Sequence, residues 1–331
     1  MTGDVAPLAM TMGDPAGIGP ELALAAWHAP ASAAPFVVFA SPGVLAAAAR
    51  RAGVTVPIIE TDPAGAAAVF SKGLPVAPLA NAIDDAPGRP NAANAAATIE
   101  SIDRAVEAVR HGDARAVVTN PIAKATLYEA GFKHPGHTEY LGALAAAWGA
   151  PAFPVMMIWS ETLKVVPVTI HMPLADAPKA LTADLIIETA RTVDSDLRAR
   201  FGVARPRLAL AGLNPHAGER GAMGREEITI IRPAIETLQA EGIDVVGPLP
   251  ADTMFHARAR ERYDVALTMY HDQGLIPVKT LAFDEGVNVT LGLPFVRTSP
   301  DHGAAFDIAG KGLANPTSLI AAVKLADRLT R

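Results

Sequence analysis

Short runs of β-branched and other apolar residues alternate with alanine-rich helical patterns along most of this chain. A strand, a helix and another strand in succession fold most readily as a βαβ unit, in which the two strands are parallel neighbours. The pattern therefore predicts the α/β fold class with a largely parallel sheet, whose ligands bind beyond the carboxyl ends of the strands. The predicted strands are residues 7–12, 35–40, 116–120, 154–159, 164–170, 207–213 and 264–270.

Helices are predicted between several of these strands, at residues 21–29, 91–112, 138–149 and 225–242. In the third helix, Leu141, Leu144, Ala145 and Trp148 fall at i, i+3, i+4 and i+7, which places them on one apolar face. Thr138 precedes this face and is the predicted N-cap of the helix.

The composition is that of a globular protein with one large or two medium domains. Of the 331 residues, 50% are hydrophobic and 19% are charged, which excludes an intrinsically disordered chain. No cysteine is present, so disulfides and thiolate metal sites are excluded. The net charge of -6 and the lack of a basic block argue against nucleic-acid and membrane partners. The N-terminus does not resemble a secretory signal and no apolar run could span a bilayer, so we expect a cytoplasmic protein.

Three of the nine histidines stand in the same sequence context. His171, His216 and His271 each come at, or shortly after, the C-terminal end of a predicted strand. Three neutral imidazoles with an open fourth position describe a catalytic site for zinc, cobalt or a similar ion. Histidines are also common in loops, and these three lack the local spacing of an H-E-x-x-H helix, so spacing alone does not decide between the two interpretations.

Other polar residues near these positions suit an anionic ligand. His137 stands at the start of a predicted helix, where free backbone N–H groups favour an anion such as phosphate. Lys279, Asn288 and Arg297 follow the third histidine along the chain. A lysine and an arginine that converge would bind phosphate or carboxylate, whereas each alone would be a solvated surface charge.

Two aspartates are candidate proton acceptors. Asp272 directly follows His271 and can orient its imidazole. Asp252, in the segment GPLPADT, is either a proton acceptor or a turn residue after Pro250.

Two glycine-rich loops follow predicted strands. GDPAGIGPEL, residues 13–22, opens a helix and suits a backbone turn near an anion. It is not the dinucleotide fingerprint G-x-G-x-x-G, which occurs nowhere in the chain, so no Rossmann domain is predicted. AGERGAMGREE, residues 217–227, leads into another helix with Glu226 and Glu227 in its first turn, an ordinary electrostatic helix start.

Seven segments run in order from residue 12 to about residue 303: MGDPAGIGPEL, PGHTEYL, IHMPL, GLNPHAGERGAMGREE, GPLPADT, MYHDQGLIPVK and GVNVTLGLPFVRTSPDHG. Together they closely resemble the motifs of the 4-hydroxythreonine-4-phosphate dehydrogenase family. A further segment, DHGAAFDIAGKGLANP at residues 301–316, resembles the cofactor loop of isopropylmalate and isocitrate dehydrogenases. Those enzymes bind NAD without a Rossmann fingerprint.

The resemblance implies an isocitrate/isopropylmalate dehydrogenase-like fold with a cleft between two α/β domains, and a homodimer with active sites at the subunit interface. We expect an outer, cofactor-side domain of residues 1–130 plus 280–331, and a central domain of residues 131–279 that carries the metal ligands and the dimer interface. The implied reaction is the oxidation of 4-phosphohydroxy-L-threonine by NAD to 2-amino-3-oxo-4-phosphooxybutanoate. This product decarboxylates to 3-amino-2-oxopropyl phosphate in pyridoxine 5'-phosphate biosynthesis.

The family's functional residues can be carried over onto matching positions of this chain. Its ligands to one divalent metal (zinc, magnesium or cobalt) fall on His171, His216 and His271; one of them comes from the partner subunit, for which we choose His271. Its substrate contacts fall on His137, Thr138, Lys279, Asn288 and Arg297. The related cofactor loop places Gly303, Asp307 and Asn315 at NAD, although Phe306 stands where that loop usually has proline. The candidate catalytic residues are Asp252, Asp272 and Lys279.

Three other interpretations stay open. Some relatives within the family oxidise D-threonate or D-erythronate 4-phosphate, and others oxidise aromatic dihydrodiols, against which the phosphate-binding residues argue. A three-histidine metallohydrolase would act without NAD. A non-catalytic binder of metal or anion is the third interpretation.

Overall fold

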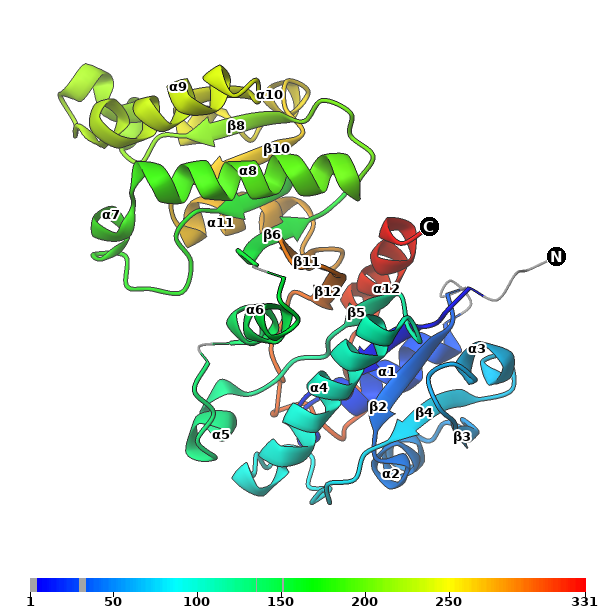
Figure 1. Cartoon of the computed structure of the whole chain (residues 1–331). Coiled ribbons are helices and arrows are strands. Elements are labelled where there is room, and N and C mark those ends of the chain that lie inside the picture. Colours follow the sequence, from blue (N-terminus) through cyan, green and yellow to red (C-terminus); the bar gives the residue numbers. More distant parts are fainter. Residues whose placement is uncertain (1–4, 30–33, 135, 151) are drawn as a thin grey trace. The chain divides into compact units, whose positions relative to one another are not determined.

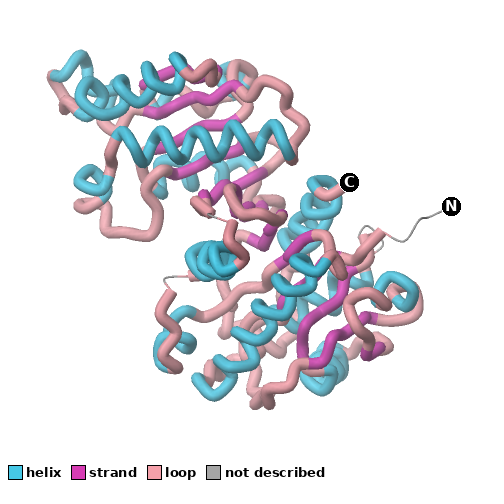
Figure 2. Tube along the Cα trace, in the orientation of Figure 1, coloured by secondary structure: helices cyan, strands magenta, loops and turns pink. Residues whose placement is uncertain are grey.

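Residues 5–29, 34–134, 136–150 and 152–331 are described by the computed structural model, and the chain divides into two units. The first unit comprises Met1–Ala150 and Leu293–Arg331, and the second comprises Pro151–Gly292. In each unit strands lie among helices (Figure 2). Our prediction divided the chain at residues 130/131 and 279/280. Helix α6, which carries His137, was therefore expected in the central domain but lies in the first unit. Strand β11, which carries Asn288, was expected in the outer domain but lies in the second unit. The roles predicted for the two domains stay predictions.

The first unit is built on six parallel strands in the order β3-β4-β2-β1-β5-β12. The strands are β1 (Leu8–Thr11), β2 (Phe36–Ala40), β3 (Ile58–Glu60), β4 (Leu74–Pro78), β5 (Ala116–Val118) and β12 (Val296–Pro300). Every residue of β1, β2 and β5 is buried, as expected for parallel strands that helices cover on both faces. In Figure 1, α4 (Ala95–His111) crosses the near face, while α1 (Gly19–His28) and α12 (Thr317–Leu329) lie behind.

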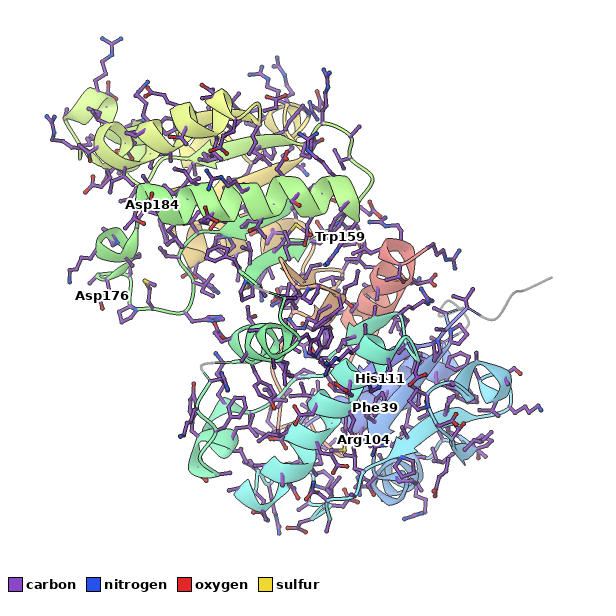
Figure 3. All side chains as sticks on the ribbon, viewed as in Figure 1. Phe39, Arg104, His111, Trp159, Asp176 and Asp184 are labelled. Carbon is purple, nitrogen blue, oxygen red and sulfur yellow. The ribbon has the colours of Figure 1, made fainter. Side chains whose placement is uncertain are left out.

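Helix α4 shows how local sequence places a helix against this sheet. Just ahead of it, the side chain of Asn91 accepts a hydrogen bond from the N–H of Ala93 in η1 (Ala92–Asn94), and α4 itself ends at Gly112, whose φ is 81°. The buried hydroxyl of Ser101 donates to Phe39 O (2.6 Å) and accepts from Met12 N (2.9 Å). Arg104, one turn on, lies over the Phe39 ring at 5.7 Å (Figure 3). These contacts fix α4 on the carboxyl ends of the central strands.

The remaining helices of the first unit lie in its connections. They are α2 (Pro42–Ala52), α3 (Ala66–Val69), α5 (Lys124–Glu129) and α6 (His137–Ala147). The apolar face predicted for α6 is confirmed, because Leu141 and Ala145 are buried.

The second unit has six strands in the order β11-β6-β7-β10-β8-β9. They are β6 (Val155–Trp159), β7 (Lys164–Pro167), β8 (Arg207–Ala211), β9 (Asp244–Leu249), β10 (Val265–Thr268) and β11 (Val287–Leu291). Strand β6 is antiparallel to both of its neighbours, whereas β7, β10, β8 and β9 are parallel. Helix α8 (Ala183–Ala199) covers the near face of the sheet in Figure 1, and α11 (His271–Leu281) lies on the far side.

The other helical segments of the second unit surround this sheet. They are α7 (Ala177–Ala180), the turn η2 (Pro215–Gly221), the π-helical turn η3 (Glu227–Ile231), α9 (Arg232–Ala240), η4 (Ala251–Thr253) and α10 (Ala257–Arg260). None of the helices in the described ranges combines the length and apolar character that crossing a bilayer requires.

All seven predicted strands are present, with slightly shorter ends. The predicted set lacked several others, among them β4 and β9. Both contain proline, and β9 also contains glycine, which lower the strand propensity of their sequences.

Candidate active site

His171 and His271 lie side by side in the second unit. Their strands β7 and β10 are parallel neighbours, so the segments that follow them leave the sheet at the same edge. The hydroxyl of Thr169 donates to Met269 O (2.7 Å) and joins these segments. The two ring centroids are 5.6 Å apart, and both residues line a cavity of about 240 Å³. Two imidazoles that the sequence separates widely therefore border one space.

Asp272 fixes the orientation of the His271 ring. His271 is the first residue of α11, and its Nδ1 lies 2.7 Å from Asp272 Oδ1. Since a carboxylate accepts, Nδ1 carries a proton, and in the neutral imidazole this leaves the lone pair on Nε2. The contact expected between these neighbours is present, and it leaves His271 able to ligate a metal through Nε2.

The third histidine is not part of this pair. Among the described residues, no three His, Cys, Asp or Glu side chains gather closely enough to hold a metal ion. His216 follows β8, the parallel neighbour of β10, and lies in the turn η2. From His216 to Arg220, φ ranges from 42° to 78°. This left-handed conformation costs roughly 1–2 kcal/mol for each residue that has a side chain.

Glu227 lies against this turn. It stands in the first helical turn, as predicted, but it is buried rather than solvated, with 2% exposure. Its Oε1 accepts from Asn214 N (2.7 Å) and its Oε2 from Asn214 Nδ2 (3.1 Å). We interpreted Glu227 as an ordinary helix start and missed this contact. The glycines at positions 212 and 218, which leave room for the close approach of the Glu227 carboxylate, are the signal that could have indicated it.

The first unit contains a buried arginine, Arg297, that could bind an anion. Arg297, on β12, is 3% exposed and donates from Nε (3.1 Å) and Nη2 (2.6 Å) to the hydroxyl of Thr119. Thr119 follows β5, the parallel neighbour of β12. Burial lowers the pKa of Arg297 to about 10, so the guanidinium stays charged at neutral pH. A buried, fixed positive charge suits an anionic ligand.

His137 is electrostatically coupled to this arginine. It is the first residue of α6, and its Nε2 is shielded from solvent with no hydrogen-bond partner among the described residues. Burial, followed by the charges of Arg297 and Lys124, holds the pKa of His137 well below its ordinary value. The group is therefore a neutral imidazole beside two cations. Lys124 was missed from the sequence, although its position shortly after a predicted strand could have indicated it.

The N-cap predicted for α6 is wrong. Gly136 is the N-cap, with φ −178° and ψ −169°, and no side chain caps the helix. Thr138 lies in the first turn instead. The extended backbone of Gly136 runs close to Lys124, whose Cε would lie 3.2 Å from a Cβ atom at this position.

The residues predicted at NAD lie in the loop between β12 and α12. Gly303 and Asp307 are exposed, and a Cβ atom on Gly303 would meet nothing within 4 Å. Asn315 Oδ1 accepts from Thr317 N (3.0 Å) at the start of α12. The glycine turn after β1 packs on this loop, because Ile18 N donates to Ala304 O (3.0 Å).

The remaining predicted residues lie in the second unit. Asn288, on β11, has a buried Oδ1 without a hydrogen-bond partner among the described residues. Lys279 shares α11 with His271, and both line a cavity of about 450 Å³. Asp252 is exposed in η4, which directly follows Pro250. This position agrees with the interpretation of Asp252 as a turn residue. In the second unit His171, His271 and Asp272 line one cavity, and Lys279 lines a second cavity with His271. In the first unit His137 is electrostatically coupled to Arg297. The roles predicted for these residues in substrate, cofactor and metal binding stay predictions.

Comparisons with known proteins agree with one another. The family model of pyridoxal phosphate biosynthetic protein PdxA matches residues 31–326. The 4-hydroxythreonine-4-phosphate dehydrogenase of a Methylorubrum extorquens strain is 62% identical over 334 residues, covering 99% of this chain and 96% of that protein.

Solved structures give the same picture. A 4-hydroxythreonine-4-phosphate dehydrogenase from Klebsiella pneumoniae matches with a TM-score of 0.86 and 36% identity, covering 98% of this chain and 100% of that one. A terephthalate 1,2-cis-dihydrodiol dehydrogenase from Burkholderia xenovorans matches with a TM-score of 0.65 and 31% identity, covering 97% of each chain. The predicted α/β fold class is confirmed.

Proposed function

Because this chain belongs to the pyridoxal phosphate biosynthetic protein PdxA family, we propose that it oxidises 4-phosphohydroxy-L-threonine with NAD and a divalent metal ion. The alcohol carbon gives its hydride to NAD and the hydroxyl gives its proton to a base. The product, 2-amino-3-oxo-4-phosphooxybutanoate, loses carbon dioxide, and its C2 takes up a proton to give 3-amino-2-oxopropyl phosphate, in the pathway to pyridoxine 5'-phosphate. The near full-length match to a 4-hydroxythreonine-4-phosphate dehydrogenase carries this proposal.

We propose that the first unit binds the phosphate through Arg297 and His137. The guanidinium supplies a buried positive charge in a fixed orientation, which strengthens its attraction to phosphate oxygens. His137 is neutral, so it contributes a hydrogen bond rather than a charge. Thr138, in the first turn of α6, adds a hydroxyl beside the free N–H groups of the helix start. The phosphate is esterified to the carbon next to the one that is oxidised, so holding it helps to fix the reacting carbon against nicotinamide.

The residues of the second unit fit a divalent metal. The imidazoles of His171 and His271 border one cavity, and imidazole nitrogen is a preferred ligand of zinc and cobalt. A divalent ion held by His171, His216 and His271 would lower the pKa of a substrate hydroxyl. Asp272 keeps His271 in the tautomer that presents Nε2 to a ligand.

We propose that the three-histidine set is completed across two subunits of a homodimer. The absence of a three-ligand group within the described part of one chain supports this arrangement. Large apolar side chains near the pair are exposed and would be covered by a second subunit: Leu174 (66%), Ile276 (64%) and Phe283 (75%). Our choice of His271 as the partner-supplied ligand stays a prediction; in one chain it lies beside His171.

We propose that an aspartate accepts the proton of the substrate hydroxyl. Asp272 is engaged by His271, which favours an orienting role for it and leaves Asp252 as the proposed acceptor of the hydroxyl proton. Lys279, on the same helix as His271, would neutralise a substrate carboxylate or phosphate. Asn288 would accept a hydrogen bond from the substrate through its buried Oδ1.

For the cofactor, we propose that NAD binds over the loop of residues 301–316. Its exposed Asp307 would accept hydrogen bonds from the adenosine ribose, and Asn315 would face the adenine. The open space at Gly303 allows the cofactor to approach the backbone. NAD and phosphorylated intermediates are metabolites of the cytoplasm, where we place the enzyme.

Initial rates with the purified protein test the function. NADH absorbance should rise only when NAD and 4-phosphohydroxy-L-threonine are both present. D-threonate 4-phosphate, D-erythronate 4-phosphate and an aromatic cis-dihydrodiol are measured side by side, and faster turnover of any of them would replace the proposed substrate. Turnover without NAD would indicate a metallohydrolase, and full turnover by His216→Ala would argue against both enzyme mechanisms.

A further inference from the structure

The turn that carries His216 has a left-handed backbone that needs support from outside. His216, Ala217, Glu219 and Arg220 have positive φ although they carry side chains, and elsewhere in the described ranges only Ala305 among the non-glycine residues does so. In this conformation the Cβ atom crowds the following carbonyl oxygen. Strained backbone of this kind persists only where its surroundings hold it. Whatever holds the turn also places the His216 imidazole.

The Glu227 carboxylate contacts the turn at several points. It accepts both hydrogen bonds from Asn214, two residues before His216. It also packs against Gly218, inside the turn, so closely that a Cβ atom there would collide with Oε2. A Cβ atom on Gly212, ahead of the turn, would lie 3.2 Å from Oε1. One carboxylate therefore bridges the entry and the middle of the left-handed segment.

Glu227 is buried without a counter-charge. Among the described residues it forms no ion pair, and its hydrogen bonds come from Asn214 alone. Taking a carboxylate out of water is costly unless donors satisfy it, and here the donors belong to the segment that leads into the turn. The helix that Glu227 opens begins with a π-helical turn, Glu227–Ile231, a feature frequent at functional sites.

We propose that Glu227 is a positioning residue that holds His216 where its imidazole can ligate the divalent metal. This role rests on the proposed function, because it takes His216 to be a metal ligand. Glu227 itself is not a ligand in this proposal: its oxygens are used by Asn214. In this proposal the contacts with Glu227 preorganise the turn for metal binding.

The test compares Glu227→Gln with Glu236→Gln in the full-length protein. Gln keeps the size of the side chain but turns an N–H₂ group toward Asn214 Nδ2 or Asn214 N, so that one hydrogen bond is lost. Glu236 is exposed on α9 and provides the same chemical change away from the turn. Two quantities are measured: the affinity for Co²⁺, from titration calorimetry and the ligand-field absorption of the bound ion, and the hydrogen-exchange rates of residues 214–221 without metal.

We expect Glu227→Gln to raise the Kd for Co²⁺ by roughly 10–100-fold and to speed exchange across the turn. Glu236→Gln should match the wild type in both. His216→Ala should weaken Co²⁺ binding, and adding Glu227→Gln to it should weaken binding no further, because both changes act through one ligand.

Wild-type Co²⁺ affinity in Glu227→Gln would overturn the role of Glu227, even if the variant is less stable. If the wild type binds no Co²⁺, or if His216→Ala binds it normally, the metal site of the proposed function fails instead, whatever Glu227 does to hydrogen exchange. Should Glu227→Gln not fold, Asn214→Ala removes the side-chain hydrogen bond to Glu227, together with the one that Asn214 Nδ2 donates to Glu226 Oε2 (2.8 Å), and should still raise the Kd. An unchanged Kd in Asn214→Ala would then count against the proposal.

Discussion

The Tyr140 hydroxyl donates a hydrogen bond to Asp103 Oδ1 at 2.5 Å and thereby joins α6 to α4. The Tyr140 ring also packs against Phe132 and His134, with centroids 5.0 Å from each. Burial raises the pKa of Asp103, and the hydrogen bond from Tyr140 opposes that rise. Because α6 carries His137 and Thr138, this contact anchors the helix on which the proposed phosphate site depends.

Tyr140→Phe should lower the free energy of unfolding by about 1–3 kcal/mol, because a half-buried carboxylate loses its donor. Urea unfolding at neutral pH measures the change. Asp103→Ala, which removes the acceptor, and the double variant complete a double-mutant cycle, in which we expect a coupling energy of about 1 kcal/mol or more. Additive effects of the two substitutions would mean that the hydrogen bond contributes nothing to stability.

The neutral state of His137 gives the protein a pH-dependent stability. In the folded protein its pKa lies well below 6.5, whereas the unfolded chain takes up the proton near that value. As the pH falls, the unfolded state therefore binds protons that the folded state does not. This contribution to stability is fully present above the unfolded pKa and is lost as the pH decreases below it, by up to about 1.4 kcal/mol per pH unit.

We expect His137→Gln to flatten the fall in unfolding free energy between about pH 7 and about pH 5. Urea unfolding at several pH values gives the slope. His256→Gln, at an exposed position of the second unit, is the matched control and should keep the wild-type slope. Equal slopes for the wild type and His137→Gln would show that His137 takes up its proton at the same pH in the folded and the unfolded state.

Arg297→Lys should raise the KM for the phosphorylated substrate by roughly 10–100-fold, with a smaller effect on kcat, because lysine keeps the charge but loses the planar donors. Those donors hold the side chain on Thr119 and would face two phosphate oxygens at once. Steady-state kinetics separates the two constants. Arg50→Lys, exposed on α2, serves as the control. An unchanged KM in Arg297→Lys would remove Arg297 from the phosphate site.

Removal of divalent metal with a chelator should abolish NADH production, and Zn²⁺, Co²⁺ or Mg²⁺ should restore it. In the same assay Asp272→Asn should need about 10–100-fold more metal for half-maximal activity, because His271 loses its orienting carboxylate. Asp184→Asn, at the exposed start of α8 (Figure 3), should behave as the wild type. Activity that survives exhaustive chelation would contradict a metal-assisted mechanism.

In the second unit, the closeness of His171 and His271 was predictable from the order of the strands in the sheet. His171 and His271 each follow a strand, and parallel neighbours bring the ends of such strands together. The left-handed turn of His216 was not predictable, because four of its five residues are types that seldom adopt that backbone. What holds it is a carboxylate in a later helix, whose sequence is that of an ordinary helix start.

In the first unit, the burial of the candidate phosphate-binding residues could not be predicted from the sequence. Arg297 and His137 were predicted as ligand contacts by resemblance, but nothing local in the sequence indicates that a guanidinium will be buried against Thr119. That burial results from β12 pairing with β5, a contact between distant parts of the chain. The N-cap of α6 was missed for a related reason, since the extended Gly136 lies against Lys124, a residue distant in sequence, and no side chain caps the helix.

The first unit is assembled from the two ends of the chain, whereas the second is one continuous segment. On the ribosome, the second unit is therefore synthesised whole while the first still lacks β12 and α12. Until these last segments emerge, one edge of β5 has no neighbour, and the buried guanidinium proposed to bind phosphate has not been made. The unit that carries the three proposed metal ligands can therefore be completed early, whereas the unit proposed to bind phosphate is completed last.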